Sequence, residues 1–209
     1  VTTKNGKVGK TNVSYNGRFS FGETTTSTDF ETRGYYSAGI NDMFYKTYQG
    51  VPYTHYTQDD YHELWIRRND KVEDPSRPWV VEKNGEYKYY GNFDWYNCLF
   101  DNTRPTWEHN LTVSGGTEKV KYMLSGNYYN QKGIIRIDPD RFKKYTFRSK
   151  IIANITSWFE LSNNTSYYHS EYTYPGLSGV NDVFTRAGRH ALASIVPMHP
   201  DGTLVYRTG

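Results

Sequence analysis

The stretch WEHNLTVSGGTEKVKYMLSGNYYN, residues 107–130, contains two runs of alternating apolar and polar residues around a Gly-Gly turn. Alternation with period two is typical of a β-strand that has one apolar and one polar face, so the stretch predicts a long β-hairpin. The side chains that fall on the apolar face are, in chain order, Trp107, His109, Leu111, Val113, Val120, Tyr122, Leu124 and Tyr128.

The same alternation occurs in three further segments, so that five strands are predicted at 12–21, 107–115, 119–130, 143–155 and 159–170. In residues 12–21 the apolar side chains are those of Val13, Tyr15, Phe19 and Phe21. The pattern of the last segment is weaker, because Asn163 falls on its apolar face. The chain is therefore expected to be an all-β protein.

The length of these strands and of their connections favours a membrane barrel over a soluble sandwich. About ten to thirteen residues per strand exceeds the usual five or six, and ten tilted residues rise roughly 25 Å, the height of a barrel's apolar band. The connections alternate between long and short, as in antiparallel barrels with short turns on one side and long loops on the other. The polar faces carry cations that suit a wide aqueous lumen, namely Lys119, Lys121, Lys144, Arg148 and Lys150.

The overall composition excludes several other classes of protein. The formal net charge is +3, without a long basic run, which argues against a nucleic-acid partner. Cys98 is the single cysteine, so the chain can form no internal disulfide and no multi-cysteine metal cluster. The first residues do not read as a signal peptide, and we expect either that a leader was removed or that the natural N-terminus lies upstream.

The order of several short motifs is similar to that of one family. The residues that carry the resemblance are SGGTEK at 114–119, Tyr122, Ser125 and Tyr128, and QKGII at 131–135. Weaker matches are VTTKNG at 1–6, Asp94-Trp95 followed by HNL at 109–111, RFKKY at 141–145 and PMHPDG at 197–202. In this order they resemble the SusC/RagA-like TonB-dependent transporters.

The resemblance implies a large, 22-stranded antiparallel transmembrane β-barrel with a plug, and long external loops that contain a short helix. Residues 1–10 would be the end of the plug and its junction with the barrel, and 11–209 the N-terminal part of the barrel. The external loops are expected at 22–106, 131–142 and 171–203. At this density of strands 22 strands need on the order of 800–900 residues, so the chain is expected to be a fragment.

The resemblance also implies a function at the bacterial outer membrane. We expect TonB-dependent import of oligosaccharides released by glycan breakdown, with a SusD-like surface lipoprotein as a lid and the TonB complex as the source of energy. A dimer of transporter–lipoprotein pairs in outer-membrane lipid is implied in the same way. The alternatives are import of oligopeptides by the same class of transporter, and a soluble secreted glycan-binding β protein.

Aromatic residues in the expected loops are the candidate ligand contacts. Their rings can stack on sugars while their polar edges form hydrogen bonds, although tyrosine also packs large loops and lines membrane interfaces. The residues chosen as candidates are Tyr35, Tyr36, Trp65, Tyr89, Tyr90, Tyr172 and Tyr174.

One helix is predicted in the first long loop, at residues 57–68. Thr57 can cap it, Asp60 stands at the capping-box position, and Tyr61, Leu64 and Trp65 share one face. That face either packs on the loop or docks a partner lid.

No enzyme chemistry is predicted. The carboxylate pairs Asp59-Asp60 and Asp138-Pro139-Asp140 have no supporting ligands in the sequence, and Asp-Pro-Asp is more typical of a turn. The six histidines are scattered. We therefore expect no catalytic residues, no metal and no cofactor.

Overall fold

The computed structural model describes residues 6–25, 27, 29–176 and 180–206, which form two compact units. The sheet unit comprises Val1–Thr25 and Asp101–Val180, and the loop unit comprises Thr26–Phe100 and Asn181–Gly209. Residues 1–5 of the predicted plug segment lie outside the described residues.

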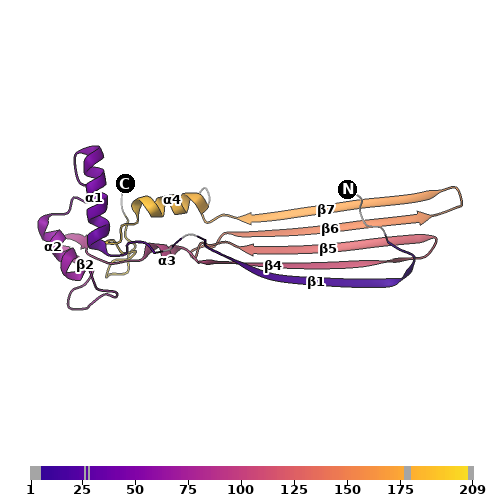
Figure 1. Cartoon of the computed structure of the whole chain (residues 1–209), viewed down its shortest axis with the longest axis horizontal. Helices are drawn as coiled ribbons and strands as arrows, with labels where there is room; N and C mark the ends of the chain where they lie inside the picture. The colour runs from indigo at the N-terminus through magenta and orange to yellow at the C-terminus, as the bar shows by residue number, and fades with distance from the viewer. Residues whose placement is uncertain (1–5, 26, 28, 177–179, 207–209) are drawn as a thin grey trace. The chain divides into compact units, whose positions relative to one another are not determined.

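The sheet unit is a five-stranded antiparallel sheet in which every strand pairs with its neighbour in the order β1-β4-β5-β6-β7 (Figure 1). The expected antiparallel sheet, with its five strands in chain order, is confirmed. The strands extend beyond the predicted limits, and β1 begins inside the segment expected to end the plug. Their bounds are β1 Gly9–Glu23, β4 Thr103–Gly116, β5 Val120–Lys132, β6 Arg141–Asn154 and β7 Glu160–Thr173.

The pairing register separates the two faces of the sheet as the sequence alternation predicts. On one face of the sheet, Val13 of β1 lies opposite Val113 of β4, and Val113 lies opposite Leu124 of β5. On the other face, one residue away along each strand, Ser14 lies opposite Thr112, and Thr112 lies opposite Ser125. We call the first the apolar face and the second the polar face. Both faces of β1 and β7 are exposed throughout.

The Gly-Gly turn between β4 and β5 has a steric cause. Gly116 has a φ of +155°, and a Cβ atom there would collide with the carbonyl oxygen of Val120. The turn closes through a 2.7 Å hydrogen bond from the Thr117 amide to that same oxygen. A side chain at Gly116 would therefore force the two strands apart.

The loop unit has its own helices and core, which corrects the expectation of a long loop with one short helix. It contains α1 Gly34–Gln49, α2 Gln58–Arg67, a hairpin of β2 Val80–Lys83 and β3 Glu86–Tyr89, α3 Trp95–Leu99, and most of α4 Val180–His190. Ala38 of α1, Leu64 of α2 and Tyr90 pack together with at most 1% of their surface exposed. None of the helices in the described part of the chain is long and apolar enough to cross a membrane.

The predicted helix at 57–68 is confirmed as α2. The Thr57 hydroxyl accepts a hydrogen bond from the Asp60 amide, and the Asp60 carboxylate accepts one from the Thr57 amide, which is the predicted capping box. The buried Tyr90 hydroxyl donates a 2.5 Å hydrogen bond to the other oxygen of this carboxylate. Asp60 therefore joins the start of α2 to the core of the loop unit.

This position of Asp60 makes the stability of the loop unit depend on pH. Burial raises the pKa of the carboxyl, but hydrogen bonds from Tyr90 and Thr57 outweigh burial and hold the pKa below its ordinary value of about 4. A carboxyl with a depressed pKa stabilises the fold above that ordinary value, and the contribution is lost as the pH falls through the folded-state pKa.

We expect Asp60→Asn to weaken protection of the α2 amides at neutral pH, and the difference from wild type to shrink below about pH 4. Hydrogen exchange of the full-length protein, corrected for intrinsic rates, measures this. The matched control is Asp59→Asn, at the exposed neighbouring position. A difference that stays constant down to pH 2.5 would contradict the assignment.

Candidate functional site

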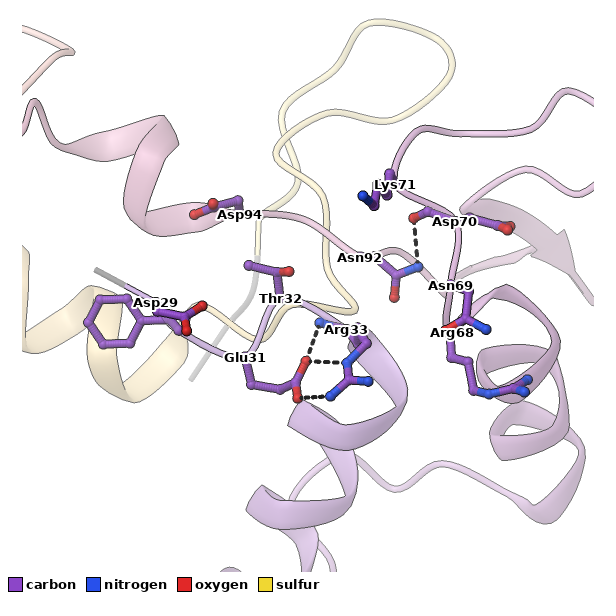
Figure 2. A pocket seen from close by; sticks show the side chains of 11 residues that line it. Asp29, Glu31, Thr32, Arg33, Arg68, Asn69, Asp70, Lys71, Asn92 and Asp94 are labelled. Carbon is purple, nitrogen blue, oxygen red and sulfur yellow. Dashed lines mark hydrogen bonds and ion pairs between the residues drawn. The ribbon is translucent and has the colours of Figure 1, made fainter. Parts of the chain in front are cut away.

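A polar cavity of the loop unit lies where α1 begins and α2 ends (Figure 2). Its volume is about 840 Å³, within the range of small-molecule sites. The side chains that line it are those of Asp29, Phe30, Glu31, Thr32, Arg33, Arg68, Asn69, Asp70, Lys71, Asn92 and Asp94.

Asn92 connects the walls of this cavity. Its side-chain nitrogen donates hydrogen bonds to the carbonyl oxygens of Arg67 and Asp70, at 2.6 and 3.0 Å. Its side-chain oxygen accepts one from the amide of Gly34, at 2.8 Å. A single amide therefore fixes the first residue of α1 relative to the end of α2, and the cavity has a built geometry.

Some of the charges around the cavity are neutralised by neighbours of opposite charge. Glu31 accepts two hydrogen bonds from the Arg33 guanidinium, at 2.6 and 2.8 Å, and these bonds lower the pKa of its carboxyl despite some burial. Asp70 binds Arg77 outside the cavity through two bonds of 2.6 and 2.7 Å. Lys71 is exposed and makes no ion pair with the other side chains drawn in Figure 2, so its ammonium group can bind an anionic ligand.

Three of the predicted ligand residues form an aromatic cluster beside two arginines that line the cavity. The Arg33 guanidinium lies 4.2 Å from the Tyr36 ring centroid, and that of Arg68 lies 3.6 Å from a Trp65 ring. Tyr35 touches both Tyr36 and Trp65 edge-on, with centroid distances of 5.2 and 5.1 Å. The two arginines thus connect the polar cavity to an aromatic cluster.

The other predicted ligand residues lie elsewhere. The Tyr89 hydroxyl is 2.7 Å from the Nε2 atom of His199, while Tyr90 has no exposed surface. The prediction of Tyr90 as a ligand residue is corrected, because its ring is buried in the core and has no surface that a ligand could contact. Tyr172 and Tyr174 form an edge-on pair in the sheet unit, with a centroid distance of 4.4 Å.

A smaller cavity of about 300 Å³ lies in another part of the loop unit and is richer in aromatic rings. Tyr56, Tyr87 and Tyr89 line it together with His55, which has a left-handed backbone with a φ of +56°. Strained backbone of this kind often occurs at functional sites. A ligand in this smaller cavity would lie against the ring of Tyr89.

The sequence reading missed the polar half of the site. Asn92, Lys71 and the two arginines are not among the predicted ligand residues, because they belong neither to the aromatic pattern nor to a carboxylate pair. The available signal is the polar run Arg67-Arg68-Asn69-Asp70-Lys71, which begins at the end of the capped helix, since binding residues are frequent in the loops that follow such elements. Among the described residues, no group of three or more His, Cys, Asp or Glu side chains could hold a metal ion.

Comparisons with known proteins find partial similarity to a TonB-dependent receptor and to a peptide importer. No family model matches it. It is 36% identical over 62 residues to the TonB-dependent receptor P26 of Formosa agariphila, a match that covers 30% of this chain and 6% of the receptor.

Two solved structures share its fold. The RagAB peptide importer in the open-open state is 21% identical, with a TM-score of 0.52 over 82% of this chain and 19% of the other. The RagAB peptide transporter is 17% identical, with a TM-score of 0.54 over 99% of this chain and 23% of the other. The chain thus spans a small part of each relative. The resemblance to SusC/RagA-like TonB-dependent transporters is confirmed by these matches.

Proposed function

We propose that this chain is part of an outer-membrane transporter that imports nutrient oligomers by a TonB-dependent mechanism. One observation carries the proposal, namely an antiparallel sheet of strands of 13 to 15 residues with one apolar and one polar face. In an outer-membrane barrel the apolar face contacts lipid and the polar face lines the lumen. The chain's activity is then binding and passage of a ligand, without bond chemistry.

The polar face supports a water-filled lumen. The Arg18 guanidinium lies 2.6 Å from the Glu108 carboxylate, and the Asn127 amide donates hydrogen bonds to Glu108 and Asn110. Lys121, which lies opposite Ile152, adds another cation to this face. Charges of this density are costly against lipid, at about 2–4 kcal/mol each near the midplane, but cost little against water.

The loop unit is proposed as the ligand-handling part of the transporter. In this arrangement it faces the outside, a SusD-like lipoprotein covers it as a lid, and the TonB complex acts through parts of the protein beyond this chain. The end of the plug and a dimer of transporter–lipoprotein pairs belong to the same proposal.

Oligopeptide is the substrate class that the large cavity favours. Its lining offers the Lys71 ammonium group, which forms no ion pair with the described side chains around the cavity, together with carboxylates and amides. These groups match the charged ends and backbone groups of a peptide. The aromatic faces that a sugar would stack on are partly covered, because Arg33 lies over Tyr36 and Arg68 over Trp65. The solved relatives are described as a peptide importer and a peptide transporter.

Oligosaccharide is the second candidate, and the smaller cavity favours it. Tyr56, Tyr87 and Tyr89 line it, so a sugar would meet several aromatic rings there. Tyr87 stacks on His199 with a centroid distance of 4.4 Å, which fixes the orientation of the ring.

The transporter proposal is tested by the intact mass of the native polypeptide that carries this sequence, taken from a detergent-extracted outer-membrane fraction. We expect roughly 100 kDa, the size of a 22-stranded barrel with its plug, and a lipoprotein that copurifies. A polypeptide that stays in the soluble fraction would refute the proposal and leave the secreted glycan-binding protein.

The substrate proposal predicts an effect of Lys71→Gln in the full-length transporter. Loss of a charge-assisted hydrogen bond is expected to weaken binding of an acidic oligopeptide about tenfold or more. Isothermal titration with the peptide and with a neutral oligosaccharide measures this. Lys46→Gln, in the last turn of α1 and away from the cavity, is the matched control. Equal binding by both variants would contradict a peptide in this cavity.

A further inference from the structure

A row of aromatic and imidazole rings crosses the whole apolar face of the sheet unit. The Tyr15 hydroxyl is 2.7 Å from the Nδ1 atom of His109 on β4. His109 stacks on Tyr128 of β5, Tyr128 contacts Tyr145 of β6, and Tyr145 stacks on His169 of β7. The centroid distances lie between 5.2 and 6.1 Å. Such rings collect where a membrane's acyl chains meet its headgroups.

On one side of this row the apolar face is hollowed at Gly126. The hollow has a volume of about 430 Å³ and an almost entirely apolar lining. A Cβ atom at Gly126 would meet no other atom within 4 Å, so the absence of a side chain leaves the space open. Leu111, Phe147 and Tyr167 form walls of the hollow. We call it the Gly126 notch.

On the other side of the row the same face becomes cationic. Lys143 lies two residues beyond Tyr145 along β6, and Arg141 lies two residues further. Arg141 is exposed and lies directly opposite Lys132 of β5. Like charges in directly opposed positions destabilise a sheet unless an anion lies between them. Protein carboxylates neutralise this cluster in part, since Lys132 lies 3.4 Å from Asp101 and Lys143 lies 3.8 Å from Glu171.

We propose that this face binds one phosphate-bearing membrane lipid, with an acyl chain in the Gly126 notch and its phosphate on Lys132, Arg141 and Lys143. The proposal rests on the proposed function, because the apolar face must contact lipid. The three features follow one another along the strands in the order in which a lipid presents its parts. Two to four residues separate the ring row from the cations, or about 7 to 14 Å, which fits the step from acyl boundary to headgroup.

Charge complementarity selects the phosphate. Four cations lie at this end of the face, because Arg136 joins Lys132 in contacting Asp101. The carboxylates there are three, those of Asp101, Glu171 and, on β1, Glu23. The excess of positive charge suits an anionic headgroup, and arginine binds phosphate in a bidentate manner. A free phosphate ion would leave the Gly126 notch empty, and an uncharged lipid would leave the cations without an anionic partner.

The experiment uses the full-length transporter in mild detergent and native mass spectrometry, with bisphosphorylated lipid A as the probe. One variant fills the notch, Gly126→Phe, and its control adds the same side chain at Gly22 on the polar face, where a Cβ atom also has open space. A second variant replaces Lys132, Arg141 and Lys143 by glutamine. Its control replaces Lys121, Lys144 and Arg148 on the polar face.

We expect both apolar-face variants to retain the lipid at least about tenfold less than their controls, because each loses one half of the contact. Dephosphorylated lipid A should bind wild type as weakly as the glutamine variant binds the probe. Retention that is unchanged by Gly126→Phe, or competition by millimolar inorganic phosphate, would overturn the proposal. Heat-modifiable migration of every variant separates this failure from a failure of the barrel itself.

Discussion

Val113→Arg is expected to prevent stable insertion of the full-length protein, whereas Thr112→Arg, one residue away, is tolerated. Val113 lies on the apolar face between Val13 and Leu124, four residues from the ring row at His109. That places it about 10 Å below the headgroups, near the middle of a 25 Å apolar band. An arginine facing lipid at this depth destabilises a barrel by about 2–4 kcal/mol.

The control has nearly the same shape and the same partial exposure. Thr112 lies on the polar face between Ser14 and Ser125, so an arginine there would enter the proposed aqueous lumen. Outer-membrane abundance, heat-modifiable migration and the urea midpoint in detergent measure both variants. In a soluble sandwich that packs its apolar face inside and exposes the polar one, both variants would stay in the soluble fraction. That result would refute the membrane assignment.

The strands could be predicted because their signal is local. Each apolar face repeats every second residue, and neighbouring strands align those faces, so sequence order and pairing order coincide. The ends of the strands were harder to predict from the sequence. Arg141 and Lys143 are polar residues on the apolar face beyond the ring row, where the alternation that marked the strand has already ceased.

Most of the loop unit could not be predicted from the sequence, because its contacts join residues that are far apart in the chain. Helix α2 was found through its capping box, but α1 begins after Arg33, which makes no side-chain capping bond. The walls of the cavity meet through the Asn92 side chain, whose three partners come from α1, from α2 and from the residues after α2. Contacts at such separations leave no periodic trace in a sequence. The aromatic candidates were therefore recognised by residue type, while the distinction between exposed and core positions among them required the fold.

Gly34→Ala is expected to have the largest effect on the candidate site. A methyl group on Gly34 would overlap the carbonyl oxygen of Gly91 and approach the Cα atom of Ser194 at 2.9 Å. Both are backbone atoms, and they are held together by a 2.8 Å hydrogen bond from the Gly91 amide to the Ser194 carbonyl. The start of α1 would have to move away, at a cost of about 1–3 kcal/mol.

That movement links the packing of the loop unit to ligand binding. It would stretch the hydrogen bond from the Gly34 amide to Asn92 and displace the neighbouring Arg33 from the cavity wall. We therefore expect Gly34→Ala to weaken both hydrogen-exchange protection of α1 and peptide binding by the full-length transporter. Gly39→Ala in the same helix meets no atom within 4 Å and should stabilise α1 by about 0.5–1 kcal/mol. If Gly34→Ala loosened α1 but left peptide binding intact, the ligand would not bind in this cavity, because its wall cannot move without changing the site.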